Sequence, residues 1–100
     1  MNKLNEALRL VRISNRKINM IRFSKTETEE HKNKKIEICN NLVKEGKSFI
    51  TEAIFIQGGR ADIFILDDLT IIEILKSEKL ENIENKKRYY PKLKIISIQV

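Results

Sequence analysis

Hydrophobic positions in the first half of the chain form a helical stripe. The segment that begins near Ser24, Thr26 or Thr28 and ends at Gly46 starts with residue types that commonly cap helices, and acidic residues follow in its first turn. Its apolar side is built from residues spaced by three, four and seven: His31, Lys35, Ile38, Cys39 and Leu42. The pattern predicts a helix that docks this side on the rest of the fold.

Three strand-like runs rich in isoleucine and phenylalanine come next, over residues 47–56, 60–66 and 70–75. The turn signals Gln57-Gly58-Gly59 and Asp67-Asp68 separate them and predict two tight hairpins. A second helix fits residues 78–90, Pro91 ends it, and a last strand fits residues 92–100. The expected order is αβββαβ, an α/β fold with a mixed sheet flanked by helices.

The N-terminal segment is ambiguous. Apolar runs over residues 7–13 and 18–23, on either side of Asn15-Arg16-Lys17, fit either a hairpin or a short helix and a strand. We take the hairpin, so that residues 1–23 form an N-terminal hairpin or extension and residues 24–100 form the core. A chain of 100 residues has room for one domain.

Charge and composition narrow the function classes. The chain has 20 basic and 14 acidic residues, and its net charge of +6 favours an anionic partner, with nucleic acid first. A single cysteine, Cys39, excludes intramolecular disulfides and thiolate zinc sites, and it is expected to pack as a small hydrophobe. No apolar run approaches 18 residues, so we expect an intracellular, cytoplasmic protein. Abundant Ile, Lys and Asn indicate an AT-rich genome, such as an archaeal or viral one.

Two acids on the strands define the candidate site. If Asp67-Asp68 is a two-residue loop, Asp62 lies directly opposite Glu73. Two like charges on neighbouring strands, with Cβ atoms roughly 4.5–5.5 Å apart, destabilise a sheet unless something compensates them. Arg60 could neutralise one carboxylate through a local salt bridge, whereas a divalent cation held by both acids would be a metal site. We favour the metal site.

At this point the sequence resembles a known family. The segments Gly58-Gly59-Arg60-Ala61-Asp62-Ile63 and Ile71-Ile72-Glu73-Ile74, with the αβββαβ order, are similar to the PD-(D/E)XK nuclease superfamily of restriction endonucleases and archaeal Holliday-junction resolvases. The resemblance covers residues 26–100 and implies a restriction-endonuclease-like core. It also implies that Asp62 and Glu73 bind Mg²⁺ or Mn²⁺, which activates a water for attack on a phosphodiester, assisted by a lysine two residues after the glutamate.

The family lysine is displaced in this chain. Leu75 stands two residues after Glu73, and Lys76 follows, where strand alternation points it to the opposite face. A one-residue bulge after Glu73 would bring Lys76 into the site as a catalytic residue. Other candidates for this role lie on the two helices: Lys34, Lys35, Lys79, Lys86 and Lys87.

Further site residues come from three places. The resemblance implies a first-helix glutamate, a role open to Glu27, which has the plainer alternative of an acid serving the helix dipole. Glu52 joins the Asp62 face if the Gly58-Gly59 loop has an odd length and leaves it if the length is even. His31 either contacts water or phosphate or, as we favour, is structural or solvated.

These observations lead to a metal-dependent DNA endonuclease or junction resolvase. Six basic residues are candidate DNA contacts: Arg16, Lys17, Arg60, Lys86, Lys87 and Arg88. A domain of this size has little surface with which to grip a duplex, and resolvases of this superfamily form homodimers, so we expect a homodimer. Leu75 supports an alternative, a catalytically inactive nuclease-fold module for nucleic-acid binding or assembly. A third possibility is that the charge serves solubility and Arg60 pairs internally with Asp62.

Overall fold

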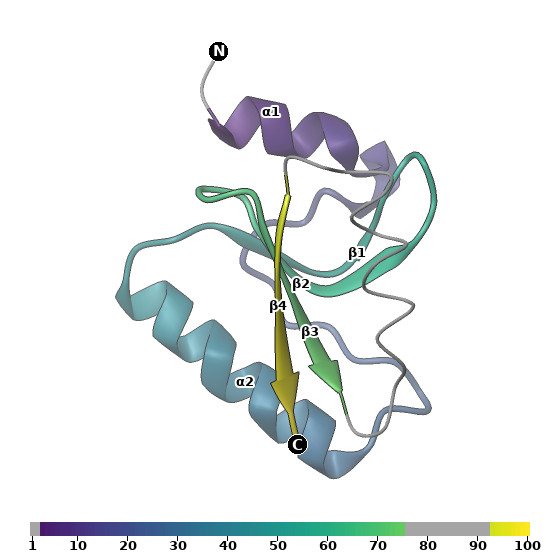
Figure 1. Ribbon diagram of the computed structural model, residues 1–100, viewed down its shortest axis with the longest axis vertical. Helices are drawn as coiled ribbons and strands as arrows, with labels where there is room; N and C mark the ends of the chain where they lie inside the picture. Colours follow the sequence, from purple (N-terminus) through teal and green to yellow (C-terminus); the bar gives the residue numbers. More distant parts are fainter. Residues whose placement is uncertain (1–2, 76–92) are drawn as a thin grey trace.

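A computed structural model describes residues 3–75 and 93–100, which form an α/β fold with a four-stranded mixed sheet (Figure 1). Two α-helices and a short 3-10 helix accompany it: α1 (Lys3–Leu10), η1 (Ile13–Asn15) and α2 (Glu29–Lys44). The strands are β1 (Phe49–Ile54), β2 (Arg60–Ile65), β3 (Thr70–Leu75) and β4 (Lys94–Gln99). No helix in the described part of the chain is both long and apolar enough to cross a membrane.

The sheet has the strand order β1-β2-β3-β4. The first three strands are antiparallel neighbours, and β4 runs parallel to β3. The four strands lie within the ranges that the sequence predicts. The pairs Ile63–Ile72, Phe64–Ile71 and Ile65–Thr70 also confirm the register that the Asp67-Asp68 turn predicts. The helix expected over residues 78–90 lies outside the described residues.

Helix α2 begins and ends where the sequence indicates. The Thr28 hydroxyl accepts a hydrogen bond from the backbone N–H of His31, which satisfies one of the free donors of the first turn. At the other end Gly46 has a φ of +73°, a left-handed conformation that suits glycine after a helix. Lys35, Cys39 and Leu42 are buried on the side that faces the sheet, as the stripe predicts.

The core has one layer on each side of the sheet. Helix α1 covers one face, where Ala7 packs in a cluster with Phe64 and Ile71. Helix α2 covers the other face, where Cys39 packs in a cluster with Ile63. Figure 1 shows the sheet between the two helices. Strands β1 and β2, which carry Glu52 and Asp62, therefore lie between two apolar layers.

The prediction of an N-terminal hairpin is wrong, because residues 3–10 form helix α1. Leu4, Ala7, Leu8 and Val11 recur at helical spacings, and all four contribute to the apolar cluster under α1. The helix begins at Lys3, before the run of residues 7–13 on which the hairpin interpretation rests. That run contains only part of the helical pattern. Residues 18–23 are not a regular strand either.

The segment after α1 covers the outer edge of β1. The backbone N–H of Arg12 donates to the carbonyl of Ile54 at 2.9 Å, and the Asn15 side-chain oxygen accepts from the N–H of Ile54 at 2.8 Å. Further along, the Thr51 hydroxyl donates to the carbonyl of Met20 and accepts from the N–H of Arg22. This edge is thereby paired, and residues 22–24 are held beside the middle of β1.

The thiol of Cys39 gives a first testable expectation. Burial raises its pKa from 9.0 to about 11, although the nearby Lys35 charge opposes the shift. A rise of about two pKa units leaves about 100-fold less thiolate at neutral pH, and the thiolate is the reactive form. We expect Ellman's reagent to label Cys39 in the folded protein at least 100-fold more slowly than in urea. Equal rates in the two conditions would contradict the packing described for α2.

Candidate functional site

The candidate site lies where β1 and β2 both depart from regular geometry. Glu52, in the middle of β1, has a φ of +51°, which is rare for a non-glycine residue. The pairs Thr51–Ile63 and Ala53–Ala61 on either side place Glu52 opposite Asp62. Backbone held in this conformation costs of order 1–3 kcal/mol and is concentrated at functional sites in proteins. The strain therefore marks this cross-strand pair of acids.

Side-chain alternation reverses at these two positions. On β1 Phe49 packs on the α2 side, whereas Ala53 packs on the α1 side, although regular alternation would put both on one side. On β2 Ile63 packs on the α2 side and Ala61 on the α1 side in the same way. The reversal takes the intervening acids out of both apolar layers and turns them toward the first turn of α2.

Asp62 joins β2, β3 and α2 through one oxygen. Its Oδ2 accepts the backbone N–H of Ile74 at 2.7 Å, in place of a carbonyl of β2. The same oxygen lies 3.3 Å from Nε2 of His31. Both of these contacts use Oδ2.

Glu27, His31 and Lys35 follow one another at intervals of four residues and share one side of the α2 region. Nδ1 of His31 contacts Oε2 of Glu27, so the imidazole bridges Glu27 and Asp62. Nζ of Lys35 lies 2.8 Å from the same Glu27 oxygen and 3.2 Å from Oε1 of Glu52. One histidine and one lysine thus connect the three carboxylates.

Lys35 is the innermost member of this cluster. Its side chain is 0% exposed, and its ammonium also donates to the carbonyl of Arg22 at 2.9 Å, so all three of its N–H donors have acceptors. Burial by itself would raise the pKa of Glu27. Hydrogen bonds from Lys35, from the backbone of Ser24 and from His31, with the Lys35 charge, outweigh that effect and hold the pKa below 4.5.

The carboxylates open into a hollow of about 240 Å³ between α2 and the sheet. We call it the acidic hollow. Its described lining is Ser24, Thr26, Glu27, Thr28, His31, Glu52, Arg60 and Asp62. Lys35 is not part of this lining and lies behind Glu27 and Glu52, so it fixes the two carboxylates relative to each other. Among the described residues, the permanent positive charges beside these three carboxylates belong to Lys35 and Arg60.

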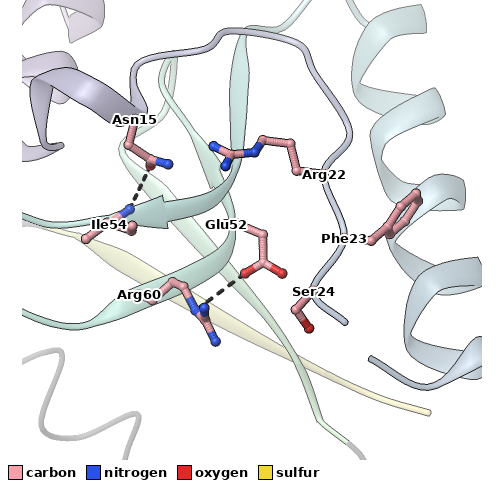
Figure 2. Close-up of a pocket in the computed structure, with 7 residues that line it drawn as sticks. All are labelled: Asn15, Arg22, Phe23, Ser24, Glu52, Ile54 and Arg60. Carbon is pink, nitrogen blue, oxygen red and sulfur yellow. Dashed lines mark hydrogen bonds and ion pairs between the residues drawn. The ribbon is translucent and has the colours of Figure 1, made fainter. Parts of the chain in front are cut away.

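A smaller hollow of about 150 Å³ adjoins the first, and Figure 2 shows its side chains. We call it the arginine hollow. It shares Ser24, Glu52 and Arg60 with the acidic hollow. Nε of Arg60 lies 3.4 Å from Oε2 of Glu52, so the internal salt bridge of Arg60 is with Glu52. Among the ion pairs described for Arg60, the partner is thus Glu52 on the neighbouring strand and not Asp62, which the sequence offered as an alternative.

The loop between β1 and β2 decides the position of Glu52. The last pair of the hairpin is Ile54–Arg60, which leaves the odd number of five residues, 55–59, in the loop. Gly58 and Gly59 have φ values of +111° and +88°, which glycine adopts at little cost. The odd-length alternative is therefore the correct one, and Glu52 lies beside Asp62.

Glu73 occupies a different position. Ile72 and Ile74 pack on the α2 side and Ile71 packs on the α1 side, so alternation along β3 places Glu73 with Ile71 on the α1 side. Glu73 is not among the described residues that line the acidic hollow. The structure brings Asp62 together with Glu27 and Glu52 instead. A metal-binding role for Glu73 stays a prediction.

The basic residues that the sequence predicts as DNA contacts also differ in whether they line the two hollows. Arg60 lines both hollows. Nε of Arg16 donates to the carbonyl of Val11 at 3.1 Å, and neither Arg16 nor the exposed Lys17 is among the described lining residues. The remaining basic candidates lie outside the described residues: Lys76, Lys86, Lys87 and Arg88.

Comparison of the chain with protein-family models, curated proteins and solved structures finds no match. Within residues 3–75 and 93–100, no group of three or more His, Cys, Asp or Glu side chains is placed so that it could hold a metal ion. A magnesium or manganese ion at this site stays a prediction.

Two residues of the site were underestimated from the sequence. His31 bridges two carboxylates, although its setting favoured a merely structural or solvated residue. Arg22 lines the arginine hollow, although it stands within the apolar run of residues 18–23, which shows no motif. The spacing of four between Glu27, His31 and Lys35 was the available signal for His31. The sequence carries no comparable signal for Arg22. Its backbone N–H is held by Thr51 of β1, which is 29 residues away in the sequence.

The lowered pKa of Glu27 predicts a pH dependence of stability. The stabilising contribution of this carboxylate is fully present above about pH 4.5 and is lost as the pH falls through its lower folded pKa. We expect Glu27→Gln to lower the free energy of unfolding at pH 7 by about 1.5–3 kcal/mol. The difference from the native chain should shrink below pH 4.5, as measured by urea denaturation across this range.

Glu29→Gln is the matched control, because Glu29 is an exposed first-turn acid that pairs only loosely with Lys32, at 3.6 Å. We expect it to change the free energy of unfolding by less than about 0.5 kcal/mol at any pH. Equal losses in the two variants at pH 7 would show that Glu27 acts only through the helix dipole.

Proposed function

We propose that this chain is a metal-dependent nuclease domain with a restriction-endonuclease-like core, acting on phosphodiester bonds in DNA. The observation that carries the proposal is that three carboxylates from different parts of the chain line one open hollow. Glu27 precedes α2, Glu52 lies on β1 and Asp62 lies on β2. The order helix, three antiparallel strands and a parallel fourth strand supports the family resemblance.

In this proposal Asp62 is the principal ligand for Mg²⁺ or Mn²⁺, with Glu52 and Glu27 beside it. A bound divalent ion lowers the pKa of its water and offsets charge on the phosphate. His31 and the backbone N–H of Ile74 hold Oδ2 of Asp62, so the other carboxylate oxygen would be the ligand. Lys35 is a positioning residue, because it touches the carboxylates from behind. The side chain of Arg60 is 62% exposed at the rim, where it can contact a substrate phosphate.

The proposal gives Glu52 the second-carboxylate role that the resemblance implies for Glu73. The family lysine is absent at position 75, and this proposal does not assign its role to Lys76. Lys35 is one of the helix lysines that the sequence offered for that role. Its buried ammonium contacts the carboxylates of Glu27 and Glu52, so we give it a positioning role and not the activation of a water. DNA as substrate and a homodimer as the active form stay predictions from charge, size and resemblance.

A silent nucleic-acid-binding module is the second candidate. It is favoured by the ion pairs, since Lys35 and Arg60 already neutralise two of the three carboxylates. Such a domain would bind DNA with a strong dependence on salt and would not cleave it.

Incubation with single-stranded, duplex, flap and four-way-junction DNA tests the proposal. The nuclease proposal predicts cleavage of at least one substrate with Mg²⁺ or Mn²⁺ and none in EDTA. Salt-sensitive binding with no cleavage under any of these conditions would favour the silent module. The absence of both binding and cleavage would contradict both candidates and favour a solubility role for the charge.

A further inference from the structure

The net charge of the chain is concentrated in one short segment. Residues 9–25 contain six basic residues and no acidic ones, whereas the rest of the chain contains fourteen of each. The whole net charge of +6 therefore belongs to this segment. We call it the basic edge segment, because hydrogen bonds tie it to the outer edge of β1.

Arginine is the commonest basic residue of the basic edge segment. Four of its six basic residues are arginines, whereas twelve of the fourteen basic residues elsewhere in the chain are lysines. The four are Arg9, Arg12, Arg16 and Arg22. A planar guanidinium donates paired N–H groups to the oxygens of a phosphate, while a lysine ammonium acts as a point charge. The composition therefore favours phosphate groups as the ligands of this segment.

Most of these basic side chains are exposed and lack an acidic partner in the described part of the chain. The exposed ones are Arg9, Arg12, Lys17, Arg22 and Lys25. None of the ion pairs within residues 3–75 and 93–100 uses a basic residue of the segment. Positive charges that no neighbouring carboxylate offsets attract a polyanion over a long range. The segment is therefore open to an anionic partner.

The basic edge segment adjoins the acidic hollow across one face of the sheet. Val11 bridges to Phe55, and both side chains are buried. Strand alternation then places Arg12 and Ile54 on the opposite face. Ile54 pairs with Arg60, which lines the acidic hollow. Figure 1 shows the end of α1 beside the loop between β1 and β2. The segment therefore lies next to the hollow proposed for cleavage.

An anionic membrane is a different class of partner with the same charge preference. Ile13 is 81% exposed in this segment, but it stands between the exposed residues Arg12 and Ser14. Segments that bind a membrane surface present an apolar face, usually that of an amphipathic helix. Here α1 packs its apolar side in the core, and η1 has only three residues. The observations therefore favour nucleic acid.

We propose that the basic edge segment binds the phosphate backbone of DNA without reading its sequence. Its contacts are Arg9, Arg12, Lys17, Arg22 and Lys25. Phosphate contacts give affinity without base information, and each one releases counterions, so binding weakens steeply with salt. The position of the bound backbone beside a cleavage site rests on the proposed function. The binding of DNA by this segment does not.

DNA binding in EDTA tests this inference without cleavage. Fluorescence anisotropy with a labelled duplex of about 20 base pairs gives the Kd over a range of salt concentrations. We expect the double substitution Arg9→Gln with Arg12→Gln to raise the Kd at least about fivefold. It should also reduce the slope of log Kd against log salt concentration by about 1–2, because two phosphate contacts are lost. Lys17→Gln with Lys25→Gln, in the same segment, should have the same effects.

Lys44→Gln with Lys94→Gln is the matched control. Both lysines are exposed, and the pair removes the same two charges from outside the segment. We expect the Kd to rise less than about twofold and the slope to stay unchanged. Thermal unfolding verifies that each variant is folded. Equal effects of the control and of the two segment variants would overturn the inference, as would a larger loss on replacing Lys86 and Lys87 with glutamine.

Sedimentation with vesicles that contain phosphatidylserine tests the membrane alternative. We expect Ile13→Ser to leave the Kd for DNA unchanged. Vesicle binding that Ile13→Ser abolishes, with no DNA binding, would overturn the inference. DNA binding through the basic edge segment without metal-dependent cleavage would retain the inference and contradict the proposed function. Metal-dependent cleavage, with a Kd that the Arg9→Gln and Arg12→Gln pair leaves unchanged, would do the reverse.

Discussion

Replacing Lys35 with methionine is expected to lower the free energy of unfolding at pH 7 by about 3–5 kcal/mol. Methionine is similar in length and retains the packing of the stem, so the loss isolates the charge. Without the ammonium, Glu27 and Glu52 face each other in a buried setting with less compensation. Such a loss is a large part of the roughly 5–15 kcal/mol that holds a small domain folded. Urea denaturation followed by circular dichroism measures it.

Lys34→Met is the matched control for this experiment. Lys34 is the neighbouring residue on α2, and its ammonium forms a surface pair with Glu37 at 3.0 Å. We expect a change within about 1 kcal/mol, as for other surface pairs. The Lys35→Met loss should also diminish at low pH, because protonation removes the uncompensated charge of the two glutamates. Similar, pH-independent losses in the two variants would show that Lys35 does not organise the site.

Asp62→Asn is expected to reduce metal-dependent cleavage at least about 100-fold while leaving the fold intact. The asparagine side-chain oxygen can still accept the N–H of Ile74, so the junction between β2 and β3 is preserved. The substitution removes the charge that a divalent ion requires. Steady-state cleavage rates in Mg²⁺ and Mn²⁺ measure the effect, and thermal unfolding verifies the fold.

Glu73→Gln is the informative companion to this variant, because the sequence alone assigns Asp62 and Glu73 equal roles. The structure places Glu73 on the α1 side of the sheet, so we expect its substitution to reduce cleavage much less than Asp62→Asn. A loss of activity in Glu73→Gln equal to that in Asp62→Asn would show that Glu73 is part of the active site. Unchanged cleavage in Asp62→Asn would identify the activity as a contaminant.

The regular part of the fold could be predicted from the sequence because its signals are local. Thr28 caps α2 and Gly46 follows its end. The Asp67-Asp68 turn correctly sets the register of β2 and β3. Helix α1 was missed because it is short and its apolar period begins close to the chain start. Its stability comes from packing on the sheet, which a local pattern does not contain.

The candidate site was predictable only in part, because its geometry depends on two irregularities. The positive φ of Glu52 reverses the direction of the following side chains on β1, and nothing in the residue type announces it. Asp62 uses its carboxylate to accept a backbone N–H of β3, which turns it away from the face that regular pairing with Glu73 assumes. The register of β2 and β3 was therefore predicted correctly, but it did not reveal which side chains lie around Asp62.

The position of a divalent ion tests the central claim most directly. Crystals of the full chain soaked in MnCl₂ and measured near the manganese absorption edge would locate the ion by its anomalous signal. The account predicts a peak in the acidic hollow, about 2.0–2.3 Å from a carboxylate oxygen of Asp62, and its loss in Asp62→Asn crystals. Soaked crystals with no manganese in this hollow, or with manganese held by Glu73 on the opposite side of the sheet, would contradict it.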